Sequence, residues 1–176
     1  VIESRGLGDV YKRQVPHPEK DENNYKWNWN TPLLVSPHNP KRLYYAAEYL
    51  FRSDDRGDSW RKISPDLTRQ IDRNKLEVMG RVWSVDTIAK NDSTSMFGSA
   101  IMISESELQE GLIYVGTDDG VLNITEDGGQ SWVKTTRFSG VPDMTYIDDV
   151  QASLHDKDTV YAVMENHKRG DQKPYV

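Results

Sequence analysis

Hydrophobic and polar residues alternate in short runs along most of the chain, which is the pattern of half-buried β-strands. The first four runs occupy positions 33–36, 43–47, 50–53 and 60–63. Pro37 and Asn39 interrupt the pattern after the first run, as turn residues do. Four short strands that follow one another in a meander form one blade of a β-propeller. We therefore expect a first blade at about 31–64.

The same pattern returns twice further along the chain. Residues 36–44, 106–114 and 153–161 align without gaps, and in each copy a Ser closes one strand while an apolar residue followed by Tyr opens the next. Such internal repetition predicts a second blade at about 99–136 and a partial third blade at about 147–176. The expected fold class is all-β: a partial β-propeller of about two and a half four-stranded antiparallel blades.

The segment 65–98 separates the first two blades and is expected to be an insertion. Within it, residues 66–76 are compatible with a short helix or coil, and residues 81–89 form a candidate strand. Two runs therefore compete for the first strand of the second blade, 81–89 and 100–105. The alignment of the three repeats favours 100–105.

An eight-residue motif occurs in both predicted complete blades, at 53–60 and 125–132, between the third and fourth strands. Its pattern is a hydroxyl residue, any residue, Asp, any, Gly, any, Ser and Trp. The Asp can accept hydrogen bonds from the backbone of a tight turn, and the Gly can adopt a positive φ. We therefore expect a structural role for the fixed positions, which are Ser53, Asp55, Gly57, Ser59, Trp60, Thr125, Asp127, Gly129, Ser131 and Trp132.

The motif resembles the Asp-box, or BNR repeat, which marks this hairpin in the propellers of sialidases, sortilin-type receptors and several glycoside hydrolases. Residues 25–176 as a whole resemble large bacterial proteins with a BNR or sortilin N-terminal domain, often labelled glycosyl hydrolases. The resemblance implies an extracytoplasmic, secreted or periplasmic protein, whose motif hairpins face away from the ligand site. The early Phe/Tyr-Arg-Ile-Pro motif of sialidases is absent from these residues.

Composition narrows the possible functions. The 176 residues carry a net charge of −6 and contain no Cys. No basic stripe indicates a nucleic-acid partner, and disulfides and thiolate metal sites are excluded. The histidines show no ligand spacing, so we expect neither a metal nor a cofactor. No apolar run approaches the roughly 20 residues that span a bilayer, and the first residues do not form a signal peptide.

The first residues match no repeat. Residues 4–14 resemble a translated sequencing adapter, so we expect 1–14 to be an artefactual or disordered leader. The chain begins with Val1, and its third blade is incomplete. We therefore expect residues 15–176 to be a fragment of a single propeller domain.

Aromatic and polar residues alternate at 25–30, which indicates a strand. These rings could form a stacking platform for a sugar. The preferred interpretation is an aromatic face that packs on a neighbouring blade.

The predicted working face lies at the end opposite the motif hairpins. The connections 64–98 and 137–147, which join one blade to the next, are long, and loops on a rigid scaffold carry function. Candidate ligand-binding residues there mix aromatic surface with charge: Arg81, Trp83, Asp86, Tyr146, Asp148 and Asp149. Asp148 and Asp149 are expected just before the innermost strand of the third blade. Together with Asp86 they are weak catalytic candidates, and a solvated loop edge is the preferred interpretation.

Two functions remain open. The first is a module that binds a protein, peptide or glycan without chemistry. The second is a glycoside hydrolase with catalytic carboxylates partly or wholly outside these residues, which would require a pair of carboxylates about 5–10 Å apart at the ligand face. Binding is favoured, because nothing in the sequence demands catalysis and fold alone does not determine function.

Overall fold

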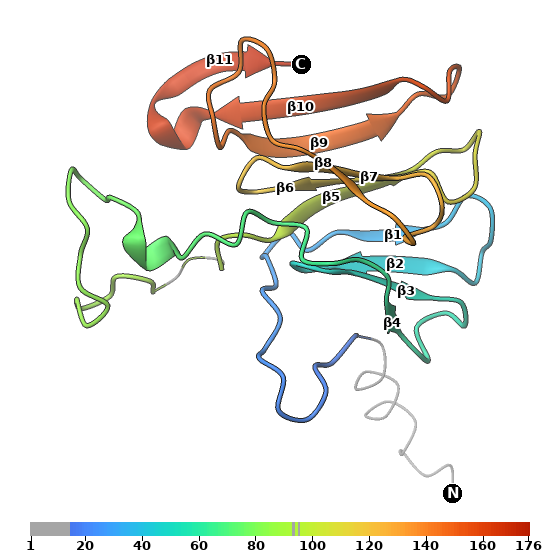
Figure 1. Cartoon of the computed structure of the whole chain (residues 1–176), viewed down its shortest axis with the longest axis horizontal. Helices are drawn as coiled ribbons and strands as arrows, with labels where there is room; N and C mark the ends of the chain where they lie inside the picture. Colours follow the sequence, from blue (N-terminus) through green and yellow to red (C-terminus); the bar gives the residue numbers. More distant parts are fainter. Residues whose placement is uncertain (1–14, 93, 95) are drawn as a thin grey trace, which may run out of the picture.

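The computed structural model describes residues 15–92, 94 and 96–176; the leader expected at 1–14 lies outside them. The described residues form three antiparallel sheets and two single-turn 3-10 helices, with no α-helix among them. Each sheet is a sequential meander of three or four strands. The chain is therefore all-β, and its sheets are the blades of a partial β-propeller, stacked one on the next as Figure 1 shows.

The first sheet has the order β1-β2-β3-β4 and the second the order β5-β6-β7-β8. The first contains β1 (Leu33–Val35), β2 (Leu43–Ala46), β3 (Leu50–Ser53) and β4 (Arg61–Lys62). The second contains β5 (Ala100–Glu105), β6 (Ile113–Thr117), β7 (Leu122–Thr125) and β8 (Val133–Thr135). The strand that opens the second sheet is thus 100–105, as the alignment of the repeats predicted.

The third sheet contains β9 (Tyr146–Ala152), β10 (Val160–Asn166) and β11 (Asp171–Tyr175), with β9 at its inner edge. Strand β9 begins earlier than the sequence indicated. Asp148 and Asp149 therefore lie within the strand and not before it, which corrects the expectation. The pairing of β9 with β10 shifts in register between Val163 and Met164, opposite Asp148, so the strand accommodates the acidic pair through a bulge.

Two apolar clusters join the sheets. Ile113 and Val115 of β6 pack toward the first sheet, whereas Tyr114 packs toward the third. All five residues of β6 are buried because both faces of the middle sheet are covered. Gly116 marks a close approach between the second and third sheets, since a Cβ there would lie 2.6 Å from Cγ2 of Ile147 in β9. The core therefore consists of two layers, one on each side of the middle sheet.

The insertion leaves the sheets at one end and projects away from them (Figure 1). It contains the 3-10 helix η1 (Arg73–Lys75), capped by the Asp72 side chain, and an isolated bridge between Val78 and Arg81. No strand forms at 81–89, so the candidate strand there was wrong. The segment folds into successive turns instead.

The aromatic segment 25–30 also forms no strand, in contrast to its alternating pattern. Tyr25 is buried against Phe51, with ring centroids 4.8 Å apart, and Trp27 lies 4.9 Å from Tyr45. Both rings cover the face of the first sheet that points away from the second. Residues 25–27 therefore act as packing and not as a stacking platform for a sugar.

Candidate functional site

The two motif hairpins, residues 53–60 and 125–132, are held by nearly the same internal hydrogen bonds. In the second, Asp127 Oδ1 accepts from the backbone N–H of Ser131 at 2.9 Å, and Oδ2 accepts from the Ser131 hydroxyl at 2.6 Å. In the first, Asp55 accepts from the backbone and hydroxyl of Ser59 at 2.9 and 2.5 Å. Both carboxylates are thus occupied by their own turn.

These hydrogen bonds also set the charge state of the two carboxyls. The Ser59 hydroxyl and backbone lower the pKa of Asp55 to about 2, and the Ser131 contacts lower the pKa of Asp127 further. Both side chains are therefore ionised at neutral pH and cannot supply a proton. This geometry fits the structural role expected for the motif.

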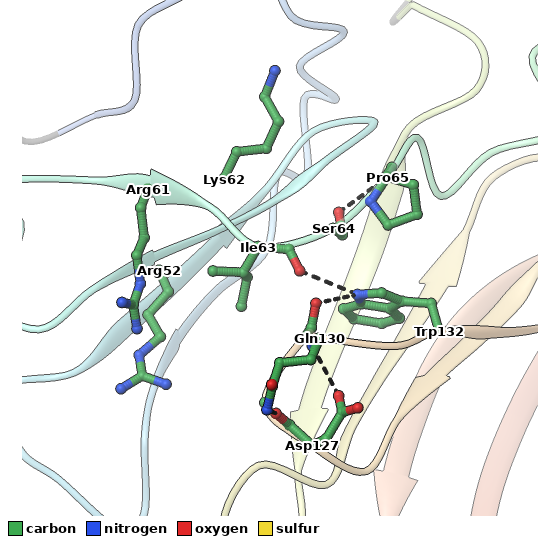
Figure 2. A pocket seen from close by; sticks show the side chains of 11 residues that line it. Arg52, Arg61, Lys62, Ile63, Ser64, Pro65, Asp127, Gln130 and Trp132 are labelled. Atoms are coloured by element: carbon green, nitrogen blue, oxygen red, sulfur yellow. Dashed lines mark hydrogen bonds between the residues drawn. The ribbon is translucent and has the colours of Figure 1, made fainter.

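A cleft of about 650 Å³ lies between the outer edge of the first sheet and the second motif hairpin (Figure 2). Arg52 and Arg61 extend along one side of it, and both guanidinium groups bind Asp54. Trp132 forms part of the other side, where its indole N–H donates to the Ile63 carbonyl at 3.1 Å. The two arginines are thus engaged within the first sheet and Trp132 joins the two sheets, and the cleft is lined by a motif hairpin, at the end opposite the predicted working face.

The six predicted ligand-binding residues fall into two groups. Arg81, Trp83 and Asp86 lie in the insertion, where the Arg81 guanidinium stacks 3.4 Å from the centroid of the Trp83 ring. The Trp83 indole N–H donates to the Val78 carbonyl at 2.8 Å, which fixes this turn. The other group lies on β9. Within the described residues, no hydrogen bond, ion pair or ring contact joins the two groups.

The three residues of the β9 group differ in burial and in hydrogen bonding. Tyr146 is half-buried and points into a smaller cleft, of about 170 Å³. Asp149 accepts a hydrogen bond from the backbone N–H of Val150 at 2.8 Å. Asp148 is exposed at the bulge. Only Tyr146 of the six predicted residues lines the cleft, which is called the Tyr146 cleft below.

Four connections meet at the Tyr146 cleft, all at the end of the sheets from which the insertion projects. The insertion contributes Phe97, and the β8–β9 connection contributes Met144. The turns β6–β7 and β10–β11 contribute acidic and basic groups. Its lining residues are Phe97, Asp118, Met144, Tyr146, Glu165, Asn166, Lys168 and Arg169.

Asp118 in the β6–β7 turn is the most perturbed carboxyl of this cleft. The residue is only 7% exposed, and its Oδ1 accepts from the backbone N–H groups of Gly98 and Ser99 at 3.0 and 2.8 Å. Burial raises its pKa to about 6, and the neighbouring Asp119 carboxylate adds to the rise, although the bonds from Ser99 act in the opposite direction. A carboxyl poised near neutral pH in a cleft is a mark of functional sites.

The first sheet uses the equivalent turn in the same way. Glu48 lies between β2 and β3, is buried, and accepts from the backbone N–H of Lys26 at 2.6 Å. Burial raises its pKa as well. In both sheets, a buried carboxylate thus holds the segment that enters the sheet. Asp118 was not singled out from the sequence; its alignment with Glu48 in the repeat was the available signal.

Tyr146 lies at the centre of the charged groups. Its pKa is raised to about 12, first by burial and then by the carboxylates of Asp118, Asp148 and Glu165. The Lys168 ammonium lies 4.5 Å from the centroid of its ring. Within the described part of the chain, no hydrogen bond is made by the Tyr146 hydroxyl, the Asp148 carboxylate or the Lys168 ammonium. These three groups remain available to a ligand.

Two further features concern metals and membranes. Among residues 15–92, 94 and 96–176, no group of three or more His, Asp or Glu side chains is arranged to hold a metal ion. No helix in that part of the chain is long and apolar enough to cross a membrane.

Comparison with known proteins gives a structural likeness. No protein-family model and no curated protein sequence matches the chain. A solved structure, the GH74 xyloglucanase from Xanthomonas campestris, is similar over 75% of this chain, with 25% sequence identity and a TM-score of 0.49. The chain spans 18% of the length of that protein.

Proposed function

We propose that this chain is part of an extracytoplasmic, sortilin-like BNR-repeat propeller that binds a protein, peptide or glycan at the Tyr146 cleft. One observation carries the proposal. The Tyr146 hydroxyl and the Lys168 ammonium line the cleft where four connections meet, and the exposed Asp148 carboxylate is close enough to raise the pKa of Tyr146; none of the three makes a hydrogen bond within the described residues. Ligand sites combine a few such polar groups with aromatic walls, which Phe97 and Tyr146 supply here.

The insertion forms a second part of the proposed working face. Arg81, Trp83 and Asp86 lie on a turn that their own contacts preorganise. In this proposal, residues 15–176 belong to one propeller domain, and the insertion contacts the outer part of a ligand held in the cleft. Loops that a rigid scaffold presents in this way are common binding elements.

A specific observation also favours a second candidate, glycoside hydrolysis. Asp118, with a pKa of about 6, shares the Tyr146 cleft with the Glu165 carboxylate. Two carboxyl groups in different environments are the arrangement that retaining and inverting glycosidases use. An enzyme would release new reducing ends from an oligosaccharide, and Asp118→Asn would abolish that release.

The proposal is tested by a panel of neutral and charged oligosaccharides and peptides, with the 176-residue chain immobilised. Tyr146→Leu, which removes the aromatic ring, is expected to weaken the binding of every ligand found by about tenfold. Asp148→Asn is also expected to weaken the binding of each. Glu126→Gln is the matched control, because it removes an exposed carboxylate from a motif hairpin. Equal binding by the parent and Tyr146→Leu would place the site elsewhere.

A further inference from the structure

The Tyr146 cleft already holds an ammonium group, which belongs to the chain itself. Lys168 lies in the single-turn helix η2 (His167–Arg169), which ends at Gly170 with a φ of 78°. Its Nζ sits 4.5 Å from the centroid of the Tyr146 ring, a cation–π distance. The side chain is otherwise exposed and makes no hydrogen bond within the described residues. Among the described residues, the Lys168 side chain thus covers the Tyr146 ring and is held there only by the cation–π contact.

The charges around this position favour a cation. Asp118 and Glu165 line the cleft, and together with Asp148 they raise the pKa of the Tyr146 hydroxyl by charge repulsion. The other basic groups nearby have partners of their own. The Arg169 guanidinium donates to the Asp143 carbonyl at 3.1 Å, and His167 Nδ1 contacts a Glu165 carboxylate oxygen at 2.5 Å. If Lys168 moved away, the cleft would present acidic groups to its next occupant, in a chain whose net charge is −6.

We propose that the Tyr146 cleft binds a lysine side chain of a peptide ligand, and that Lys168 occupies this place until the ligand displaces it. This inference rests on the proposed function, because it names the ligand of the same cleft. The face of the Tyr146 ring binds the ligand ammonium, and the nearby carboxylates offset its positive charge. Phe97 and Met144 line the walls, where the apolar stem of a lysine can pack.

The position of Lys168 favours lysine over other cations. The cleft already accommodates the unbranched side chain of Lys168, with its ammonium group over the Tyr146 ring. An amino sugar carries its ammonium directly on a pyranose ring and has no stem to lie between Phe97 and Met144. The cleft volume of about 170 Å³ also suits a single side chain better than a sugar unit with its neighbours.

The proposal predicts competition between Lys168 and the ligand. Lys168→Met removes the resident charge and keeps an unbranched side chain of similar shape. This variant should bind a lysine peptide more tightly than the parent does, by roughly 2- to 30-fold, which is the range for losing a competing cation–π contact. Tyr146→Leu combined with Lys168→Met should bind the same peptide more weakly than Lys168→Met alone, by a similar factor, because the ligand then loses the ring with no resident lysine to offset the loss.

The experiment is calorimetric titration of the 176-residue chain with the capped tripeptide Gly-Lys-Gly. Matched probes carry Nε-acetyllysine or norleucine in place of Lys, and glucosamine oligomers form a separate arm. Lys157→Met is the control variant, since it removes an exposed lysine that pairs with Asp158 in the β9–β10 turn. Lys168→Gln is a second variant, and melting curves show that each variant is folded.

We expect the lysine peptide to bind, the acetyllysine and norleucine probes to fail, and Lys168→Met to bind more tightly while Lys157→Met matches the parent. Weaker binding by Lys168→Met, or equal binding of the acetylated probe, would overturn the inference. Binding of glucosamine oligomers alone would assign a glycan instead. Tyr146-dependent binding of other panel ligands would preserve the proposed function while this inference fails.

Discussion

The first and second sheets are built from the same repeat, yet their equivalent residues lie in different environments. Leu33 in β1 pairs with Tyr45, and Ile103 in β5 pairs with Val115, so the two occupy the same place. Leu33 is 61% exposed, whereas Ile103 is 6% exposed. The second sheet packs on the first, while residues 25–27 cover only part of the first sheet's corresponding face. The repeat specifies each sheet, but the preceding neighbour decides what its face contacts.

The motif hairpins show the same contrast. The Trp132 indole N–H donates to the Ile63 carbonyl of the first sheet and to the Gly129 carbonyl. The Trp60 indole nitrogen is buried without a hydrogen-bond partner among the described residues, and its ring lies 6.1 Å from Tyr45. One hairpin therefore joins two sheets, and the other closes a single sheet. The following predictions probe this difference.

The largest expected effect is at the two tryptophans. Trp132→Ala should lower the free energy of unfolding by about 2–4 kcal/mol, because it removes an interface ring and its hydrogen bond. Trp60→Ala should lower it by less, about 1–2 kcal/mol, since no indole hydrogen bond is lost. Urea unfolding followed by circular dichroism measures both values. Equal losses would show that the interface to the preceding sheet contributes nothing at Trp132.

The glycines of the hairpins sharpen the comparison. Gly129 has a φ of 102°, and a Cβ there would lie 2.5 Å from the Ile63 carbonyl oxygen. Gly57 has a φ of 95°. Gly57→Ala should cost about 1–2 kcal/mol from backbone strain. Gly129→Ala should cost about 1 kcal/mol more, because it also forces the sheets apart. The same unfolding assay decides whether the two variants differ.

The buried carboxyls of the turns predict a pH effect of about 1–3 kcal/mol. Because the pKa of Asp118 is raised to about 6, its contribution to stability is complete below the unfolded value near 4 and is lost as the pH rises through 6. The titratable groups around it are the neighbouring Asp119 and, in the same cleft, Tyr146, Glu165, Lys168 and Arg169. Asp118→Asn should flatten the stability profile between pH 4 and pH 7. A profile unchanged by Asp118→Asn, with Glu126→Gln as control, would contradict this account.

The hairpin carboxylates predict a smaller effect of opposite sign. The pKa of Asp55 is lowered to about 2 by Ser59, and that of Asp127 is lowered by Ser131. Their contribution is present above the unfolded value near 4 and is lost as the pH falls toward 2. Asp55→Asn combined with Asp127→Asn should therefore lose less stability than the parent across that window. Acid titration followed by circular dichroism tests this, and parallel curves would contradict it.

The sequence predicted the fold well because each strand pairs with the next strand along the chain. Alternating runs located the strands, and the repeat alignment selected β5 over 81–89. It failed at 25–30, where alternation produced no strand because the segment lies across a sheet face instead of along an edge. It also misplaced the start of β9, since Asp148 and Asp149 interrupt the apolar alternation and the strand absorbs them as a bulge.

The candidate site was only partly predictable. Tyr146 was identified because it lies in the long connection 137–147, on the predicted working face. Asp118 was missed, since its burial depends on Gly98 and Ser99 folding back over the β6–β7 turn. Lys168 was missed because its position over Tyr146 depends on pairing within the third sheet. Contacts between distant segments leave little trace in local pattern.

The central claim is that ligand binding occurs at the Tyr146 cleft and not at the motif hairpins. Peptide-resolved hydrogen exchange of the 176-residue chain, with and without a saturating ligand from the panel, tests it most directly. The account predicts slower exchange at 144–148 and 165–169 and unchanged exchange at 53–60 and 125–132. Protection at the hairpins, with none around Tyr146, would contradict it.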